Sequence, residues 1–379
     1  MPTFFAEEAA SPSEAPFQRK EKKPVNGFPI ATMFRKSSVE GDIGIELEFE
    51  GSNLPKKDDP ENPWGSFKSS LIPKEWDYHH DGSLRGKNGN AEYVLKKPCK
   101  FDELEDRLDD LWDMFEKAET QMEESNRTSV HIHLNAQTWH LNRITSFLGI
   151  YFCLEDILTK WCGEHRVGNL FCLRGRDATG IVQHLKKFIK SDGDSNYLID
   201  GLHYAGLNCH ALVKFGSIEV RSLRGVTDKQ TVLDWVSILR RLYDLSGSFE
   251  DPRSVCSEFS GSGAFDFLET LLGDNTNTVL NGCGMDNQEI IQSMHDGIRL
   301  AQDICYCRDW SLYKPVEINP DPFGRNPRTV QNQIEAYSSE NSNSLSNGFV
   351  PPTFNSINMN EHYETALNDL VPFIEEIPY

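Results

Sequence analysis

The chain has 379 residues, of which 38% are hydrophobic and 11% aromatic, and its formal net charge is −20. This length allows a large buried core in one or two domains. The negative charge argues against non-specific binding to nucleic acid, which requires cations opposite the phosphates. The sequence contains no run of about 18 apolar residues, so no membrane span is predicted. The nine scattered cysteines and the lack of a secretory signal near Met1 favour a cytoplasmic protein with free thiols.

The first 38 residues are rich in Pro, Ser, Glu and Lys and show little periodicity, which predicts a flexible N-terminal arm. Ordered structure is expected to begin with a strand over residues 43–49. Because side chains alternate between the two faces of a strand, Ile45 and Leu47 share one face and Glu46 and Glu48 the other. The same alternation also fits a solvated edge strand.

A proline-dotted loop is predicted over residues 51–74, followed by a turn at Asp81-Gly82. Asp81 fits a metal ligand, a turn-forming side chain, or both. Glu92 lies a few residues further on, at the start of a short strand. Apolar residues at three- and four-residue steps then predict a helix over residues 101–124.

A second strand with ionisable residues two apart spans residues 129–134, and places His131 and His133 on one face. Imidazole is a common metal ligand, although a lone His-x-His motif also occurs by chance at surfaces. A long helix is expected over residues 138–162. The basic segment 166–176 that follows fits either a site for an anionic substrate or a solvated loop.

A third alternating strand, within residues 204–223, places Glu219 and Arg221 on one face. The guanidinium of arginine matches phosphate and carboxylate through a rigid fork of donors. The pair therefore fits a cation ligand beside an anion-binding group, and it also fits a structural salt bridge. An amphipathic helix is predicted over residues 227–245.

Further helices are expected over residues 265–272, 288–302 and 361–376, with an irregular segment at 309–359. We divide the chain into the arm 1–38, a main domain 39–250 that contains the three alternating strands, and a C-terminal helical and irregular extension 251–379 packed on that domain. The predicted class is α+β, in which antiparallel strands carry the ionic face and helices cover the other side. Desolvated carboxylates on one sheet face are costly unless they are paired or bind metal, so this face indicates a divalent cation.

The order of these motifs resembles that of the amidoligase family, a branch of the carboxylate–amine ligases related to glutamine synthetase and glutamate–cysteine ligase. The resemblance spans roughly residues 41–246. It implies a glutamine-synthetase-like catalytic domain, in which a curved antiparallel sheet forms a funnel with helices on its outer face. It also implies ATP-dependent formation of an amide or isopeptide bond between a small-molecule or peptide carboxylate and an amine, through an acyl phosphate. Two or three Mg²⁺ ions, or Mn²⁺ in their place, would serve as cofactors.

The resemblance further implies roles for single residues. One set of metal ligands would be Glu46, Asp81 and Glu92, and a second set Glu48, His131 and Glu219. The implied catalytic residues are Arg221, Glu46 and Asp81, and the implied contacts to ATP are His133, Arg221 and Asn208. Tyr204 would help to shape the substrate cleft.

Two other functions remain open from the residues alone. A metal-dependent hydrolase or a cupin-like enzyme would use the same Glu and His face, although a cupin would be expected to carry a further His where Glu219 and Arg221 stand. A catalytically inactive ligase fold would act as a binding protein.

Overall fold

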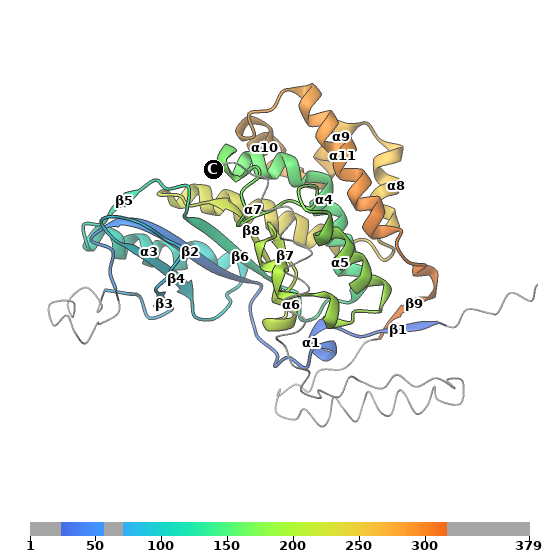
Figure 1. Ribbon diagram of the computed structural model, residues 1–379, viewed down its shortest axis with the longest axis horizontal. Coiled ribbons are helices and arrows are strands. Elements are labelled where there is room, and N and C mark those ends of the chain that lie inside the picture. Colours follow the sequence, from blue (N-terminus) through green and yellow to red (C-terminus); the bar gives the residue numbers. More distant parts are fainter. Residues whose placement is uncertain (1–23, 57–70, 317–379) are drawn as a thin grey trace, which may run out of the picture.

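The computed structural model describes residues 24–56 and 71–316 (Figure 1). Its centre is a seven-stranded sheet of order β3-β4-β2-β6-β8-β7, with β5 paired to the end of β2. The strands are β2 (Ile43–Ser52), β3 (Trp76–His79), β4 (Asn90–Leu95), β5 (Gln121–Glu123), β6 (Ser129–Asn135), β7 (Leu207–Asn208) and β8 (Ser217–Arg224). All pairings in this sheet are antiparallel, and β3 and β7 form its open edges. The predicted α+β class is therefore confirmed.

Ten helices accompany this sheet in the described part of the chain. They are α1 (Ile30–Met33), α3 (Leu104–Lys117), α4 (Leu141–Cys162), α5 (Thr179–Lys190), α6 (Ala211–Lys214), α7 (Lys229–Ser246), α8 (Arg253–Gly261), α9 (Ala264–Leu272), α10 (Thr276–Gly282) and α11 (Asn287–Cys305). Short 3₁₀ turns span Phe101–Glu103, Glu164–Arg166, Ser195–Tyr197, Asp200–Tyr204, Gly273–Asn275 and Trp310–Leu312.

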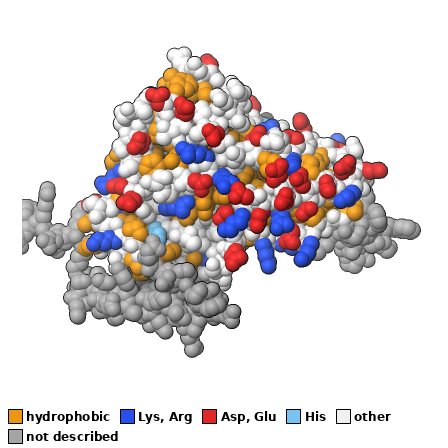
Figure 2. Space-filling model, turned by 180° about the vertical axis from the view of Figure 1, so that it is seen from behind, with side chains coloured by type: hydrophobic (Ala, Val, Ile, Leu, Met, Phe, Trp, Pro, Cys, Tyr) orange, Lys and Arg blue, Asp and Glu red, His pale blue; other side chains and the backbone are white. Residues whose placement is uncertain are grey.

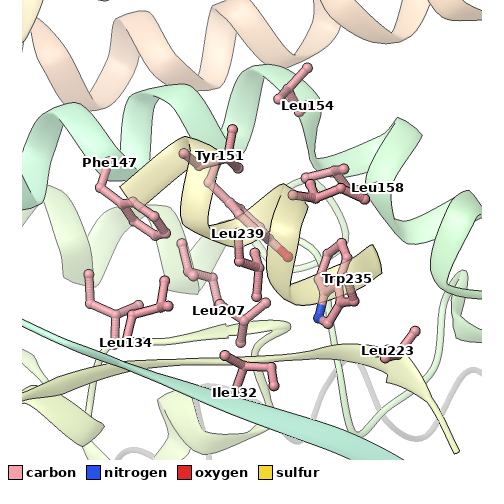
Figure 3. Close-up of a cluster of buried hydrophobic side chains, with 14 of the residues drawn as sticks. Ile132, Leu134, Phe147, Tyr151, Leu154, Leu158, Leu207, Leu223, Trp235 and Leu239 are labelled. Carbon is pink, nitrogen blue, oxygen red and sulfur yellow. The ribbon is translucent and has the colours of Figure 1, made fainter. Parts of the chain in front are cut away.

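The apolar face of the sheet packs against α4 and α7, as Figure 3 shows. Side chains from the strands point toward the two helices and meet side chains from them: Ile132, Leu134 and Leu223 on the strands, and Phe147, Tyr151, Trp235 and Leu239 on the helices. Burial of each large apolar side chain stabilises the fold by about 1.5–3 kcal/mol. This packing leaves the opposite, polar face of the sheet free to carry the ionisable residues.

Helix α4 is apolar on nearly all sides because α11 covers the side that faces away from the sheet (Figure 1). The two helices approach closely at Gly297 of α11. A Cβ atom there would lie 2.8 Å from the carbonyl oxygen of Cys153, and closer still to that of Phe152. Elements beyond residue 250 therefore contribute to the same core as the sheet.

The predicted helix over 101–124 was too long, because α3 ends at Lys117. Glu119 has φ of +53°, and Thr120 N–H donates to the carbonyl of Phe115 at 2.9 Å, which is the hydrogen bond of a Schellman motif. Residues of β5 then turn back and pair with the end of β2. A Gly or Asn at the left-handed position usually marks the end of a helix in the sequence. Here that position is Glu119, so the sequence gives no such mark.

Ordered structure also begins earlier than the expected strand at residue 43. Strand β1 (Val25–Gly27) pairs in parallel with β9 (Tyr313–Pro315), and Ile30 of α1 is fully buried. The expected helix 361–376 lies outside the described residues, as do most of the irregular segment and much of the predicted loop 51–74. The division into three domains stays a prediction.

No helix among the described residues combines the length and apolarity needed to cross a membrane. Even α4, with 22 residues, carries Arg143, Glu155, Asp156 and Lys160. On the molecular face seen in Figure 2, basic side chains lie interspersed among acidic ones.

Candidate functional site

The polar face of the sheet gathers side chains from five neighbouring strands, β4, β2, β6, β8 and β7. Register places Glu46 of β2 opposite His131 of β6, and Glu48 of β2 opposite Glu92 of β4. Glu219 of β8 lies opposite both His133 of β6 and Asn208 of β7. Since directly opposed residues have Cβ atoms about 4.5–5.5 Å apart, these side chains converge on one area of the sheet.

Glu46 lies at the centre of this area. Its carboxylate forms hydrogen bonds with both imidazoles, from Oε2 to Nδ1 of His131 at 3.1 Å and from Oε1 to Nε2 of His133 at 3.2 Å. Burial alone would raise the pKa of Glu46, but the two histidines hold it well below its usual range. Burial acts to lower the pKa of His133, but the bond to Glu46 and the charges of Glu46 and Glu219 together raise it.

Glu48 is held by Ser129, the first residue of β6. The backbone N–H and the hydroxyl of Ser129 both lie 2.7 Å from Glu48 Oε2, and the hydroxyl also lies 2.7 Å from His131 Nε2. Burial raises the pKa of Glu48, against the opposing effects of His131 and Ser129. Sequence reasoning assigned Ser129 no role, although its position two residues before His131 places it on the same strand face.

Glu219 is bound from two sides. Arg221 Nη1 forms an ion pair with its Oε1, and Asn208 Nδ2 donates to its Oε2 at 2.6 Å. Burial would raise the pKa of Glu219, but Arg221 and the two histidines lower it. Asn208 Oδ1 accepts a bond from the His210 amide at 2.9 Å, so the structure uses the Asn208 side chain to orient Glu219.

A β-bulge sets the direction of Arg221. The register between β6 and β8 shifts between Val130 and Ile132, so that Arg221 and Ser222 both face the single residue His131. Arg221 points into the polar site, whereas Ser222 contacts the core, where its hydroxyl lies 2.9 Å from that of Tyr151 on α4.

Glu92 and Asp81 complete the acidic set. Burial, together with the charges of Glu46, Glu48 and Asp81, raises the pKa of Glu92 to about 8. Asp81 Oδ1 accepts the Ser83 amide at 2.6 Å, which is its turn-forming role, and its charge also raises the pKa of Glu48. Asp81 therefore lies at the edge of the site.

Glu50 continues the polar face of β2 and holds the turn that carries Asp81. Its Oε1 accepts the backbone N–H of Arg85 at 2.6 Å. Arg85 in turn donates through its guanidinium to the carbonyls of Gly82 and Leu84. The turn is thus attached to the strand that carries Glu46.

Two groups of side chains can each hold a cation. Their ligand atoms lie within 4.8 Å of one another, in the groups Glu46, Glu92 and His131, and Glu46, His133 and Glu219. Both groups share Glu46. The structure also brings together the set Glu48, His131 and Glu219 that the family resemblance implied, since His131 Nε2 lies 3.8 Å from Glu48 Oε1 and His131 Nδ1 lies 3.7 Å from Glu219 Oε1. The site carries more carboxylates than the single guanidinium of Arg221 can neutralise. Each of the two groups offers two carboxylates and one imidazole. This oxygen-rich set suits Mg²⁺ or Mn²⁺.

Tyr204 and the basic segment 166–176 lie beside the site. Tyr204 is 44% exposed, and its ring centroid lies 6.5 Å from that of Phe171, whose carbonyl accepts a bond from Arg221 Nε at 3.5 Å. The arginines of the segment have partners of their own. Arg174 pairs with Asp156 and Asp177, Arg176 pairs with Asp156 and Asp296, and Arg166 is buried. The segment is therefore neither a free anion-binding surface nor a simple solvated loop.

Residues 70–243 match the model of a family described as "Putative amidoligase enzyme". The matched segment contains Asp81, Glu92, His131 and Glu219, whereas Glu46 precedes it on the strand between β4 and β6. None of the curated proteins matches the chain.

Proposed function

We propose, from the place of this chain in the amidoligase family, that it is an ATP- and Mg²⁺-dependent carboxylate–amine ligase. It would join a small-molecule or peptide carboxylate to an amine through an acyl phosphate. The observation that carries the proposal is the pair of ligand groups that share Glu46, next to an arginine on the same face. Cations and a guanidinium around the phosphates both offset the charge that develops in phosphoryl transfer.

The proposal extends to the shape of the catalytic domain. The polar face of the sheet would be the inner wall of a curved, glutamine-synthetase-like funnel, and α3, α4 and α7 would pack on its outer side. This arrangement is supported by the position of α4 and α7, which both pack on the apolar face of the sheet and not on its polar face.

The side chains of the site fit two or three Mg²⁺ ions, with Mn²⁺ as a substitute. Glu46, Glu92 and His131 would hold one ion, and Glu46, His133 and Glu219 a second. Bound cations would supply charge compensation for the phosphates of ATP. Glu48 and Asp81 lie close enough to these groups to act on Glu92 electrostatically, so they are the candidates for a third ion.

In the first step, an oxygen of the substrate carboxylate attacks the γ-phosphorus of ATP. The bond to the β–γ bridging oxygen breaks, and ADP leaves. Arg221 holds the transferred group, because its fork of donors matches phosphoryl oxygens. Asn208 and the ion pair with Arg221 keep Glu219 in place.

In the second step, the amine nitrogen attacks the acyl carbon, the bond from that carbon to oxygen breaks, and phosphate leaves. The amine loses a proton to a carboxylate at the edge of the site, where Asp81 lies. His133 would contact either a cation or a phosphate oxygen by giving up one of its two bonds, from Nε2 to Glu46 or from Nδ1 to Ser217 of β8.

A metal-dependent hydrolase or cupin-like enzyme is the second candidate, and the two histidines that share Glu46 favour it. The excess of carboxylates and the Arg221–Glu219 pair favour the ligase. A cytoplasmic location and the absence of a nucleic-acid partner stay predictions.

Calorimetric titration with Mg²⁺ and the non-hydrolysable analogue AMP-PNP tests the proposal, followed by assays of ADP release with panels of acids and amines. We expect binding by the wild-type protein, and loss of turnover in Glu48→Gln and Arg221→Ala. Arg299→Ala serves as a control, because Arg299 is exposed on α11 and pairs with Asp296 of the same helix. A well-folded protein that binds no Mg²⁺–AMP-PNP would exclude the ligase, and nucleotide-independent hydrolysis would favour the second candidate.

A further inference from the structure

We infer that Arg166 is a positioning residue for Arg221, and that it acts by holding the carbonyl groups of the bulge from which Arg221 projects. Because Arg221 contacts phosphate only under the proposed function, the inference rests on that function. It gives a role to the one arginine of segment 166–176 that has no acidic partner among the described residues.

The guanidinium of Arg166 spans the bulge. Its Nε donates to the carbonyl of Ser222 at 3.1 Å, and its Nη2 donates to the carbonyl of Arg221 at 2.7 Å. These are the two residues that face His131 together, where the ladder of β6 and β8 loses its regular spacing. A fork of donors at fixed separation is suited to two successive carbonyls.

Burial makes this arrangement costly. Arg166 is only 2% exposed, and within the described part of the chain no carboxylate forms an ion pair with it. A buried cation that bonds only to neutral carbonyls is expensive to desolvate, and an apolar side chain would stabilise the core at less cost. A role in placing Arg221 accounts for an arginine at this position.

The same segment holds other parts of Arg221. The Nε of Arg221 contacts the carbonyl of Phe171, and the backbone N–H of Arg221 donates to the carbonyl of Gly206 at 2.8 Å. Gly206 N–H in turn bonds to the carbonyl of Leu173 at 2.8 Å. The backbone and the guanidinium of Arg221 are therefore both fixed against residues 166–173, and Arg166 is the member of that segment that binds the bulge itself.

The position of Arg166 is set by the end of α4. Gly163 ends the helix with φ of +136°, and the Arg166 amide donates to the Gly163 carbonyl at 2.9 Å within the 3₁₀ turn. The Cys172 thiol lies 3.6 Å from the Arg166 carbonyl, so the backbone of Arg166 is constrained on both sides. A shift of its guanidinium would thus be transmitted to the bulge and not absorbed by a flexible loop.

A double-mutant cycle tests this role, with the affinity for Mg²⁺–AMP-PNP measured by calorimetry. We expect Arg166→Met to weaken binding by about tenfold, the size of a typical coupling between contacting residues. Arg221→Ala should weaken it at least as much, and the double variant should bind no more weakly than Arg221→Ala alone. Arg166→Lys should recover part of the affinity.

Arg174→Met is the matched control, because Arg174 belongs to the same segment but pairs with Asp156 and Asp177. Its affinity should stay within about twofold of wild type. Unchanged binding by Arg166→Met, or additive losses in the double variant, would overturn the inference alone. No binding by the wild-type protein would overturn the proposed function and the inference with it. If Arg166→Met does not fold, Arg166→Lys takes its place in the cycle, and the same two results decide.

Discussion

Replacement of Ser129 by Ala tests how the candidate site keeps its metal ligands in place. The hydroxyl of Ser129 lies 2.7 Å from both Glu48 Oε2 and His131 Nε2, and alanine removes both contacts. The bond from the Ser129 backbone N–H to Glu48 remains. The change therefore leaves the strand intact while it removes the bond to His131 Nε2, whose ring keeps its bond to Glu46, and one of the two bonds to Glu48 Oε2.

A hydrogen bond to a charged group contributes about 1.5–3 kcal/mol. Loss of a partner that orients a metal ligand typically costs about 10–100-fold in metal affinity. Since only one of the two bonds to Glu48 is lost, we expect Mn²⁺ to bind Ser129→Ala about tenfold more weakly. The free energy of unfolding of the metal-free protein should fall by about 1–2 kcal/mol.

The assay is a Mn²⁺ titration followed by electron paramagnetic resonance of the free ion, with urea denaturation of the same samples. Ser246→Ala is the control, because Ser246 is likewise buried and its hydroxyl donates to the Tyr243 carbonyl at 2.7 Å, in the helix α7. A folded Ser129→Ala protein with wild-type Mn²⁺ affinity would refute the reasoning. So would an equal loss of affinity in Ser246→Ala.

Three further predictions concern stability and metal binding. Burial raises the pKa of Glu155 to about 8 from a usual 4.5, against a bond from the Gly175 amide. The stability that Glu155 contributes is therefore complete below pH 4.5 and is lost as pH rises through 8, by up to about 1.4 kcal/mol per pH unit. Urea denaturation should show a free energy of unfolding that depends less on pH in Glu155→Gln than in the wild-type protein. The same pH dependence in both proteins would contradict the raised pKa of Glu155. Gly297→Ala should cost about 1–3 kcal/mol in thermal melts, whereas Gly261→Ala, with open space at its Cβ, should not; equal stability of both variants would contradict the close packing of α4 and α11. Mn²⁺ at a hundred times its Kd should stabilise the wild-type protein by about 2.7 kcal/mol. The same Mn²⁺ concentration should stabilise Glu219→Gln by less, as measured by the shift in melting temperature. Identical shifts in the two proteins would argue against Glu219 as a ligand.

The alternation of residues along three strands was sufficient to predict which residues share the polar face. Glu46, His131 and Glu219 do lie together, because a period of two is a local property of any strand. The antiparallel sheet and the helices on its apolar side followed from the same pattern.

Features that depend on the pairing of distant segments could not be predicted in this way. The grouping of His131 with Glu46 and Glu92 depends on the register between β2, β4 and β6, which no single strand encodes. The bulge at Arg221 and its contact with Arg166 depend on a one-residue mismatch between β6 and β8. The end of α3 at Lys117 is similarly hidden, because a glutamate adopts the left-handed conformation that usually selects glycine.

A crystal structure of the protein with Mg²⁺ and AMP-PNP would test the central claim most directly. We expect density for cations between Glu46 and Glu92 and between Glu46 and Glu219, with the terminal phosphate of the nucleotide within hydrogen-bond distance of Arg221. A nucleotide bound elsewhere, or a polar sheet face that holds cations but excludes the nucleotide, would contradict the account.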